Sequence, residues 1–269
     1  MPPSSSRLVE VRYAVPLHRE NNAWELTEET MPESILHGDA VDLLKALLTR
    51  WAAANATTMG DVLIARNVAV RWDEAHPKVG VDPDVCVLQP APRDAQNVSS
   101  IRTWLPDHHP PVLAFEVVSE SNPHKDYTLA PDKYAVSGTV ELCVFDPLLA
   151  GPSSHGGPHR LQLWSRREDG ALVRVYAGEG PAFSSVLRAW LVVVDEGRRL
   201  RIADDEAATR FWMTGEEHER AEKALERAEK ERERAEKEHE RAAKEHERAE
   251  KELALARIAE LEAQLRSSH

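Results

Sequence analysis

The sequence lacks the features that mark secreted and membrane-spanning proteins. Its 269 residues include only two cysteines, and both Cys86 and Cys143 lie in apolar runs, which argues against a disulfide framework and a cysteine-rich zinc site. No apolar run approaches the roughly 18 residues of a membrane span. Residues 1–12 lack the apolar middle region of a signal peptide. These absences predict a protein that stays in a reducing cytoplasm and does not enter a membrane.

An excess of positive charge is also missing. The chain carries 34 basic and 46 acidic residues, for a formal net charge of −12. Nonspecific coating of nucleic acid requires a strongly basic surface that displaces counterions, so this class of protein is excluded, whereas a small basic cleft is still allowed. The length is sufficient for one large domain or two small ones.

Residues 216–269 differ in composition from the rest of the chain. They contain 17 acidic and 13 basic residues and no glycine or proline, and alanine recurs every seventh residue from Ala221 to Ala249. This pattern predicts one continuous helix. Once per heptad a glutamate precedes a lysine by four residues, an orientation that stabilises a helix surface. We therefore divide the chain into an N-terminal extension (1–34), a folded domain (35–215) and a heptad-repeat helical tail (216–269).

The sequence leaves two states open for this tail. Next to the alanines, a second heptad position carries leucine at its two ends, but Arg232, His239 and His246 in the middle, where a coiled coil requires apolar side chains. A better apolar stripe of Ile258, Leu261 and Leu265 follows in a different register. The tail is predicted to assemble a homo-oligomer through its ends. The alternative is a single solvated helix stabilised by its own ion pairs.

Residues 35–215 combine a long helical pattern with short apolar runs. Between Ile35 and Ala54, apolar side chains recur at helical spacing and predict a helix with one buried face. A second, short helix is predicted over Tyr127–Ser137, with Gly138 at its C-terminal end. Runs rich in β-branched residues predict strands at 62–72, 85–88, 112–118, 140–145, 161–164, 172–176 and 191–194. The predicted fold class is therefore mixed α/β.

Two acidic residues stand out in these predicted strands. Asp84 opens one strand, and Glu116 lies inside another that is otherwise apolar, where an isolated carboxylate is costly unless it is paired or bound to a cation. If the two strands are neighbours, the carboxylates face each other and offer oxygen ligands for Mg²⁺ or Mn²⁺. Alternatively, Glu116 lies at a sheet edge and reaches solvent or an arginine.

Short motifs surround the two acids along the chain. They are Pro83-Asp84-Val85, Phe115-Glu116-Val117-Val118-Ser119, Asp126, Tyr134, Gly138, Glu141 and Val144-Phe145-Asp146-Pro147, with His37 upstream and residues 163–166 and 185–187 downstream. Between Ile35 and Ile202 this series resembles the Uma-type restriction endonuclease family, a group within the PD-(D/E)xK nuclease superfamily. The charged tail is similar to tails that many members carry.

The resemblance implies a restriction-endonuclease-like core, in which a mixed sheet is flanked by helices and acids on adjacent strands hold a divalent metal. Asp84 matches the acid of the family's Pro-Asp motif and Glu116 that of its third motif, so both are expected to be catalytic and to bind Mg²⁺ or Mn²⁺. The implied reaction is metal-dependent hydrolysis of DNA phosphodiester bonds. The alternative is a non-catalytic nuclease-fold module that binds or scaffolds through its tail.

The family pattern is incomplete at its basic residue. In the wider superfamily a lysine follows the acid by two residues, where this sequence has Val118. In the family that this sequence resembles, the lysine instead comes four residues after the aspartate that matches Asp126. This sequence has Ala130 at that position. Lys133, three residues further on, can share that helix face and is the first candidate for the missing charge, and Lys125 is the second. If both are ordinary surface lysines, the chemistry is impaired or lost.

Overall fold

The structure, a computed structural model, describes residues 10–11, 24–26, 34–153 and 157–267. Most of the predicted N-terminal extension (1–34) therefore lies outside the described residues. The chain divides into two compact units, Met1–Gly215 and Glu216–His269.

A seven-stranded mixed sheet organises the first unit. Its strands follow the order β1-β9-β8-β7-β6-β4-β2. Only β6 and β7 run parallel, and every other neighbouring pair in this sheet is antiparallel. The strands are β1 (Glu10–Val11), β2 (Leu63–Ala65), β4 (Val85–Leu88), β6 (Leu113–Val117), β7 (Glu141–Phe145), β8 (Leu161–Arg166) and β9 (Leu172–Gly178). The predicted mixed sheet is thus confirmed.

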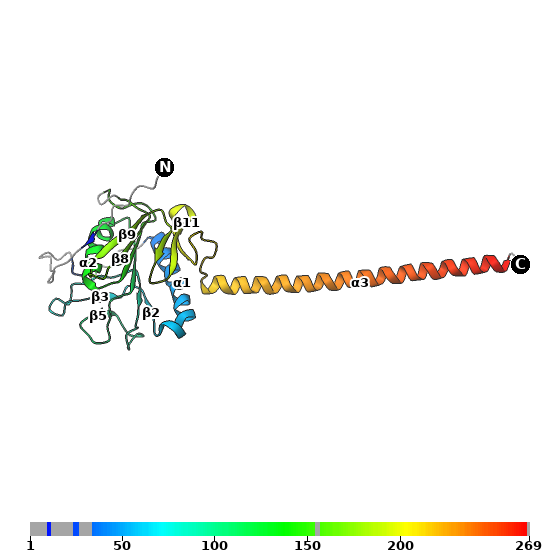
Figure 1. Ribbon diagram of the computed structural model, residues 1–269, viewed down its shortest axis with the longest axis horizontal. Coiled ribbons are helices and arrows are strands. Elements are labelled where there is room, and N and C mark those ends of the chain that lie inside the picture. Colours follow the sequence, from blue (N-terminus) through cyan, green and yellow to red (C-terminus); the bar gives the residue numbers. More distant parts are fainter. Residues whose placement is uncertain (1–9, 12–23, 27–33, 154–156, 268–269) are drawn as a thin grey trace. The chain divides into compact units, whose positions relative to one another are not determined.

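Helices cover both faces of this sheet (Figure 1). One face packs against α1 (Ile35–Met59) and a three-stranded antiparallel sheet of β10 (Ala182–Ser184), β11 (Ala189–Val194) and β12 (Arg199–Ala203). A 3₁₀ turn, η4 (Asp195–Gly197), joins β11 to β12. The other face packs against the π-helical turn η2 (Lys125–Leu129), α2 (Ala130–Ser137) and a parallel pair formed by β3 (Ala69–Arg71) and β5 (Ser100–Arg102).

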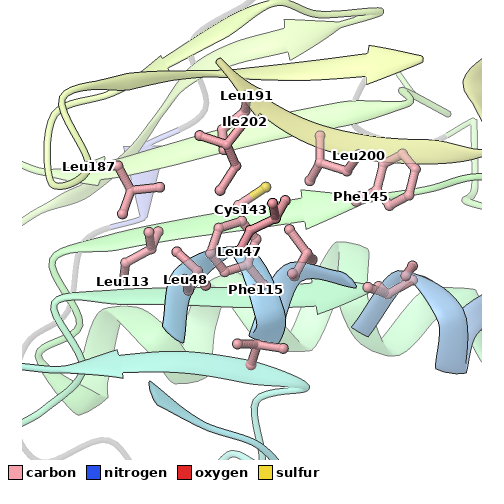
Figure 2. Packing of buried hydrophobic residues seen from close by; sticks show 14 of the residues in the cluster. Leu47, Leu48, Leu113, Phe115, Cys143, Phe145, Leu187, Leu191, Leu200 and Ile202 are labelled. Atoms are coloured by element: carbon pink, nitrogen blue, oxygen red, sulfur yellow. The ribbon is translucent and has the colours of Figure 1, made fainter. Parts of the chain in front are cut away.

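Side chains alternate between the two faces of the central strands, so neighbouring residues belong to two separate hydrophobic cores. In β6, Phe115 and Val117 join the cluster under α1, whereas Ala114 joins the cluster under α2. Figure 2 shows the first cluster, where side chains of α1, the central strands and the three-stranded sheet fill one space. Because Glu116 lies between Phe115 and Val117, it faces the α2 side.

Specific polar contacts fix the ends of the two helices. Ser34 caps α1 by accepting a hydrogen bond from the His37 N–H at 3.2 Å. α2 ends at Gly138, whose φ of 91° belongs to the left-handed region. The Arg166 guanidinium of β8 donates to the carbonyls of Tyr134 at 3.0 Å and Ala135 at 2.7 Å, near the C-terminal end of α2. α1 is therefore anchored at its N-terminal end and α2 near its C-terminal end.

Several elements differ from the sequence-based expectations. The run predicted as one strand over 62–72 breaks at Asn67, which has a φ of 52°, into β2 and β3 of two different sheets. The second helical segment begins before Tyr127, because Lys125 already belongs to η2. Strands β1, β5, β10 and β12 were not predicted. The strands β4, β6, β7, β8, β9 and β11 lie where apolar runs predicted them, to within a few residues.

The second unit is a single helix, α3 (Gly215–Ser267). This confirms the predicted continuous helix. All five predicted Glu–Lys pairs form, with N–O distances between 2.5 and 4.0 Å. Leu225, Leu253, Leu255 and Ile258 are exposed, and the side chains of Leu261 and Leu265 lie outside the described ones. Within the described part of the chain, no helix has the length and apolar character needed to cross a membrane.

Both cysteines are buried free thiols. This agrees with the expectation that the fold does not depend on a disulfide.

A buried carboxylate links the two sheets of the first unit and provides a test of this packing. Glu141 of β7 accepts hydrogen bonds from the Ser184 hydroxyl at 2.6 Å, from the Ser185 N–H at 2.8 Å and from the Ser185 hydroxyl. We expect Glu141→Gln to lower the free energy of unfolding by about 1–3 kcal/mol, because its amide cannot accept from all three donors. Urea unfolding measures the change. An equal effect of Glu168→Gln, at an exposed position, would contradict this role.

Candidate functional site

The pairing of β4 with β6 brings Asp84 and Glu116 together. These strands are antiparallel, with Val85 opposite Phe115, so continuing the register by one residue places Asp84 opposite Glu116. β6 lies between β4 and β7 in the interior of the sheet, and Glu116 is only 1% exposed. The alternative of Glu116 at a sheet edge is therefore wrong.

Each of the two acids has one oxygen engaged by protein donors. Oδ2 of Asp84 accepts the Val117 N–H at 2.6 Å and lies 3.3 Å from Nε2 of His37. Oε1 of Glu116 accepts the Tyr134 hydroxyl at 2.6 Å. Among the described residues, no hydrogen bond engages Oδ1 of Asp84 or Oε2 of Glu116. Two fixed carboxylates thus each retain one oxygen for a further partner.

A third acid, Asp126, is buried beside this pair. It lies in η2 and is 3% exposed. Burial raises the pKa of Asp126 to about 7, and the Asp84 carboxylate acts in the same direction, although Lys125 opposes both. Burial, together with the charges of Asp84 and Asp126, also raises the pKa of Glu116 well above its usual range. The site therefore concentrates more negative charge than its protein environment readily stabilises.

Lys125 supplies the positive charge that acts most strongly on these acids. The Glu116 carboxylate raises the pKa of Lys125 most, burial opposes this, and Asp126 and Asp84 raise it further. Its ammonium group consequently stays protonated. The π-helical turn carries Lys125 and Asp126 side by side at the start of the segment, and turns of this kind are frequent at functional sites.

Lys133, the first candidate from the sequence, is buried on α2 and also interacts with Glu116. Burial lowers the pKa of Lys133 to about 8, the nearby positive charge of Lys125 acts in the same direction, and Glu116 opposes both. The two lysines therefore differ: the acids raise the pKa of Lys125, whereas the lowered pKa of Lys133 means that it starts to lose its proton just above neutral pH. Neither of them is an ordinary surface lysine.

The donor set fits a hard divalent cation that takes few protein ligands. Carboxylate oxygens suit Mg²⁺ and Mn²⁺, and Mg²⁺ commonly binds one or two carboxylates and keeps several waters. Over the described residues, no group of three or more His, Cys, Asp or Glu side chains is arranged to hold a metal ion. A cation at Asp84 and Glu116 would therefore complete its coordination with water and substrate oxygens.

Three partners of the acids were not assigned roles from the sequence. Asp126, Tyr134 and His37 belong to the motifs that carry the family resemblance, but their spacing alone does not reveal what they contact. Tyr134 meets Glu116 from α2 and His37 meets Asp84 from α1, on opposite faces of the sheet. The sequence motifs mark these residues, but only the fold shows which acid each of them contacts.

Comparison with known proteins identifies a family. Residues 18–178 match the Uma2 family, described as "Putative restriction endonuclease". This match ends at the last residue of β9 and includes every residue of the site. A crystal structure from Anabaena variabilis ATCC 29413, of "a putative nuclease belonging to DUF820", is 12% identical, with a TM-score of 0.38 over 60% of this chain and 78% of that chain. No curated protein matches the sequence.

The raised pKa of Asp126 predicts a pH-dependent stability. In the folded protein Asp126 holds its proton up to a pKa of about 7, whereas the usual value is 3.8. Ionised Asp126 therefore destabilises the fold progressively as pH rises between these values. Without divalent cations, we expect Asp126→Asn to raise the unfolding free energy by roughly 1–3 kcal/mol at pH 8 and by little at pH 4.

Thermal unfolding in a chelating buffer across this pH range measures the effect. The matched control is Asp61→Asn, at an exposed position. A loss of stability in Asp126→Asn at pH 8 would show that the ionised carboxylate stabilises the folded protein.

Proposed function

Because the chain belongs to the Uma2 family, we propose that it is a divalent-metal-dependent endonuclease that hydrolyses DNA phosphodiester bonds at Asp84 and Glu116. One observation carries this proposal. The two acids lie on adjacent strands, each keeps one oxygen that no hydrogen bond from the described residues engages, and their charges raise the pKa of Lys125. Carboxylates held in this way are suited to bind a cation, and the cation can in turn bind a phosphate.

Asp84 and Glu116 would hold Mg²⁺ or Mn²⁺ through Oδ1 and Oε2. When bound, the cation lowers the pKa of a water ligand and neutralises charge on the phosphate. Val117 and His37 hold Asp84, and Tyr134 holds Glu116, so the two acids need little reorganisation to receive it. The raised pKa of Glu116 supports this assignment, since a cation relieves the repulsion among the acids.

Lys125 is the better candidate for the charge that stabilises the transition state. Its strongest interaction is with Glu116, and the acids keep its ammonium group protonated. An oriented positive charge of this kind stabilises the negative charge that grows on a phosphate during attack. Lys133 is the second candidate, reversing the order that the sequence suggested, because its pKa of about 8 leaves its charge less secure.

The second candidate function is a nuclease-fold module without catalysis. The observation that favours it is Ala130, which occupies the position where the family pattern has lysine and is only 1% exposed. If neither Lys125 nor Lys133 replaces that lysine in the reaction, the acids bind a cation but the chain serves as a binding or scaffolding unit.

We also propose that α3 assembles copies of the chain. Leu253, Leu255 and Ile258 are exposed near its C-terminal end, and exposed apolar side chains on a helix gain free energy when a second helix covers them. The ion-paired stretch before them contributes little to pairing, because Arg232, His239 and His246 occupy a position that a coiled coil keeps apolar.

Cleavage assays distinguish the two functions. With Mn²⁺ or Mg²⁺, we expect the chain to cut duplex DNA and Asp84→Asn to abolish cutting. Lys125→Met should lower the rate by roughly a hundredfold or more, because one oriented charge is worth about 3 kcal/mol. Lys133→Met should have a smaller effect. Gel analysis of supercoiled plasmid under single-turnover conditions measures each rate.

The matched control is Lys45→Met, which removes an exposed lysine of α1. A chain that binds Mn²⁺ but cuts neither duplex nor single-stranded DNA would support the non-catalytic module. If Lys125→Met cuts as fast as the unmodified chain, the transition-state charge comes from elsewhere.

Light scattering tests the assembly. We expect the full chain to form dimers or larger assemblies, and a chain ending at Gly215 to be monomeric. Leu253→Lys together with Ile258→Lys should dissociate the full chain, because charged side chains cannot be buried between helices at low cost. Monomeric masses for both chains at concentrations up to about 100 µM, where most specific complexes are already formed, would rule the proposal out.

A further inference from the structure

We propose that Tyr134 and His37 are positioning residues that fix the orientation of Glu116 and Asp84, and that Tyr134 contributes more than His37. This inference rests on the proposed function, because it concerns how the two acids are presented to a divalent cation. It names two side chains that need not touch the cation or the DNA. Each reaches one acid from a different helix, on opposite faces of the sheet.

Tyr134 is the sole hydrogen-bond donor to the Glu116 carboxylate among the described residues. Its side chain is fully buried, and its hydroxyl lies 2.6 Å from Oε1. Burial raises the pKa of Tyr134, and the Glu116 carboxylate raises it further, so the hydroxyl keeps the proton that it donates. A glutamate side chain has three rotatable bonds, and this one contact selects an orientation in which Oε2 remains available.

The backbone that carries Tyr134 is itself held in place. Arg166 donates to the Tyr134 and Ala135 carbonyls and, through Nε, to the Thr139 carbonyl at 2.8 Å. These bonds join the end of α2 to β8, two strands away from Glu116 in the sheet. A donor can impose an orientation only if it is less mobile than its acceptor, and this connection provides that rigidity.

His37 contacts Asp84 as Tyr134 contacts Glu116, but a second group contacts the same Asp84 oxygen. Nε2 of His37 and the Val117 N–H both meet Oδ2 of Asp84, at 3.3 and 2.6 Å. The Val117 N–H belongs to the backbone of β6 and remains when His37 is replaced. Among the described residues, removing the His37 contact therefore leaves Asp84 with the Val117 N–H as its donor, whereas removing the Tyr134 hydroxyl leaves Glu116 with none. This difference sets the expected order of the two effects.

Mn²⁺ titration of the full chain, with free Mn²⁺ measured by electron paramagnetic resonance, tests the proposal. We expect Tyr134→Phe to weaken Mn²⁺ binding roughly 10- to 100-fold and His37→Asn by less than about tenfold, as is typical for residues that orient metal ligands. Glu116→Gln identifies binding at this site by abolishing it. Circular dichroism melting establishes that each variant is folded.

Two controls remove similar contacts elsewhere. Tyr127→Phe removes a buried hydroxyl that donates to Asp146 at 2.9 Å, and His76→Asn removes a histidine that lies 3.1 Å from Asp73. Both should leave Mn²⁺ affinity within about twofold of the unmodified chain, because these contacts are made to Asp146 and Asp73 and not to Asp84 or Glu116. A loss in Tyr127→Phe equal to that in Tyr134→Phe would overturn the proposal, since the effect would then be general softening of the helix.

The outcomes separate this inference from the proposed function. If the unmodified chain binds Mn²⁺ through Glu116 and Tyr134→Phe binds it equally well, the positioning role is wrong and the proposed function stands. If the unmodified chain binds no Mn²⁺, the proposed function fails. A metal-free crystal structure of Tyr134→Phe then decides the inference: several orientations of Glu116 support it, and a single unchanged orientation overturns it.

Discussion

The confinement of three carboxylates within one site is the constraint on which the rest of the structure depends. Glu116 projects from the middle of a seven-stranded sheet, and Asp84 and Asp126 lie close enough to raise its pKa. Buried charges of one sign are costly unless protons, donors or cations compensate them. Compensation comes from Lys125, from the hydrogen bonds that the Tyr134 hydroxyl and the Val117 N–H donate, and from the His37 imidazole, whose Nε2 lies 3.3 Å from Asp84. It remains incomplete, because the pKa of Asp126 still rises to about 7. A site left short of positive charge has free energy to gain from a cation.

Meeting this constraint involves both layers of the fold. Asp84 and Glu116 come from adjacent strands, which give them a fixed separation, and the two side chains that meet them, His37 and Tyr134, come from helices on opposite faces. Each helix is fixed by a polar contact that lies outside the site: Ser34 caps α1 beside His37, and Arg166 binds the carbonyl of Tyr134. Contacts that look purely structural thereby determine where a hydroxyl or an imidazole meets a carboxylate. The family match covers α1, α2 and the acid-bearing strands, but it ends before the three-stranded sheet and the tail.

Sequence reasoning found what short-range patterns determine. The apolar runs gave β4, β6 and β7, and the position of Glu116 within an otherwise apolar strand identified it as a residue that needs a partner. It could not find β10 or β12, because these short strands depend on pairing with β11. It treated 62–72 as one strand, since nothing in the hydrophobic pattern reveals that Asn67 adopts a left-handed conformation. The role of Tyr134 was equally hidden, because its partner is 18 residues away on another element.

The missing lysine shows how local helix geometry can change the chemistry that a motif predicts. With regular α-helical spacing, the charge is expected at Ala130 or one turn later, which made Lys133 the first candidate. In η2, however, the Ala130 N–H donates to the Lys125 carbonyl across five residues, so these two positions lie one wide turn apart. A residue that seemed to precede the helix thus becomes part of it.

Lys125 can then face Glu116 from the same segment that carries Asp126, while Ala130 packs in the core under α2. A lysine at position 130 is therefore not the only arrangement that brings an ammonium group to these acids, and its absence is weak evidence that the chemistry has been lost.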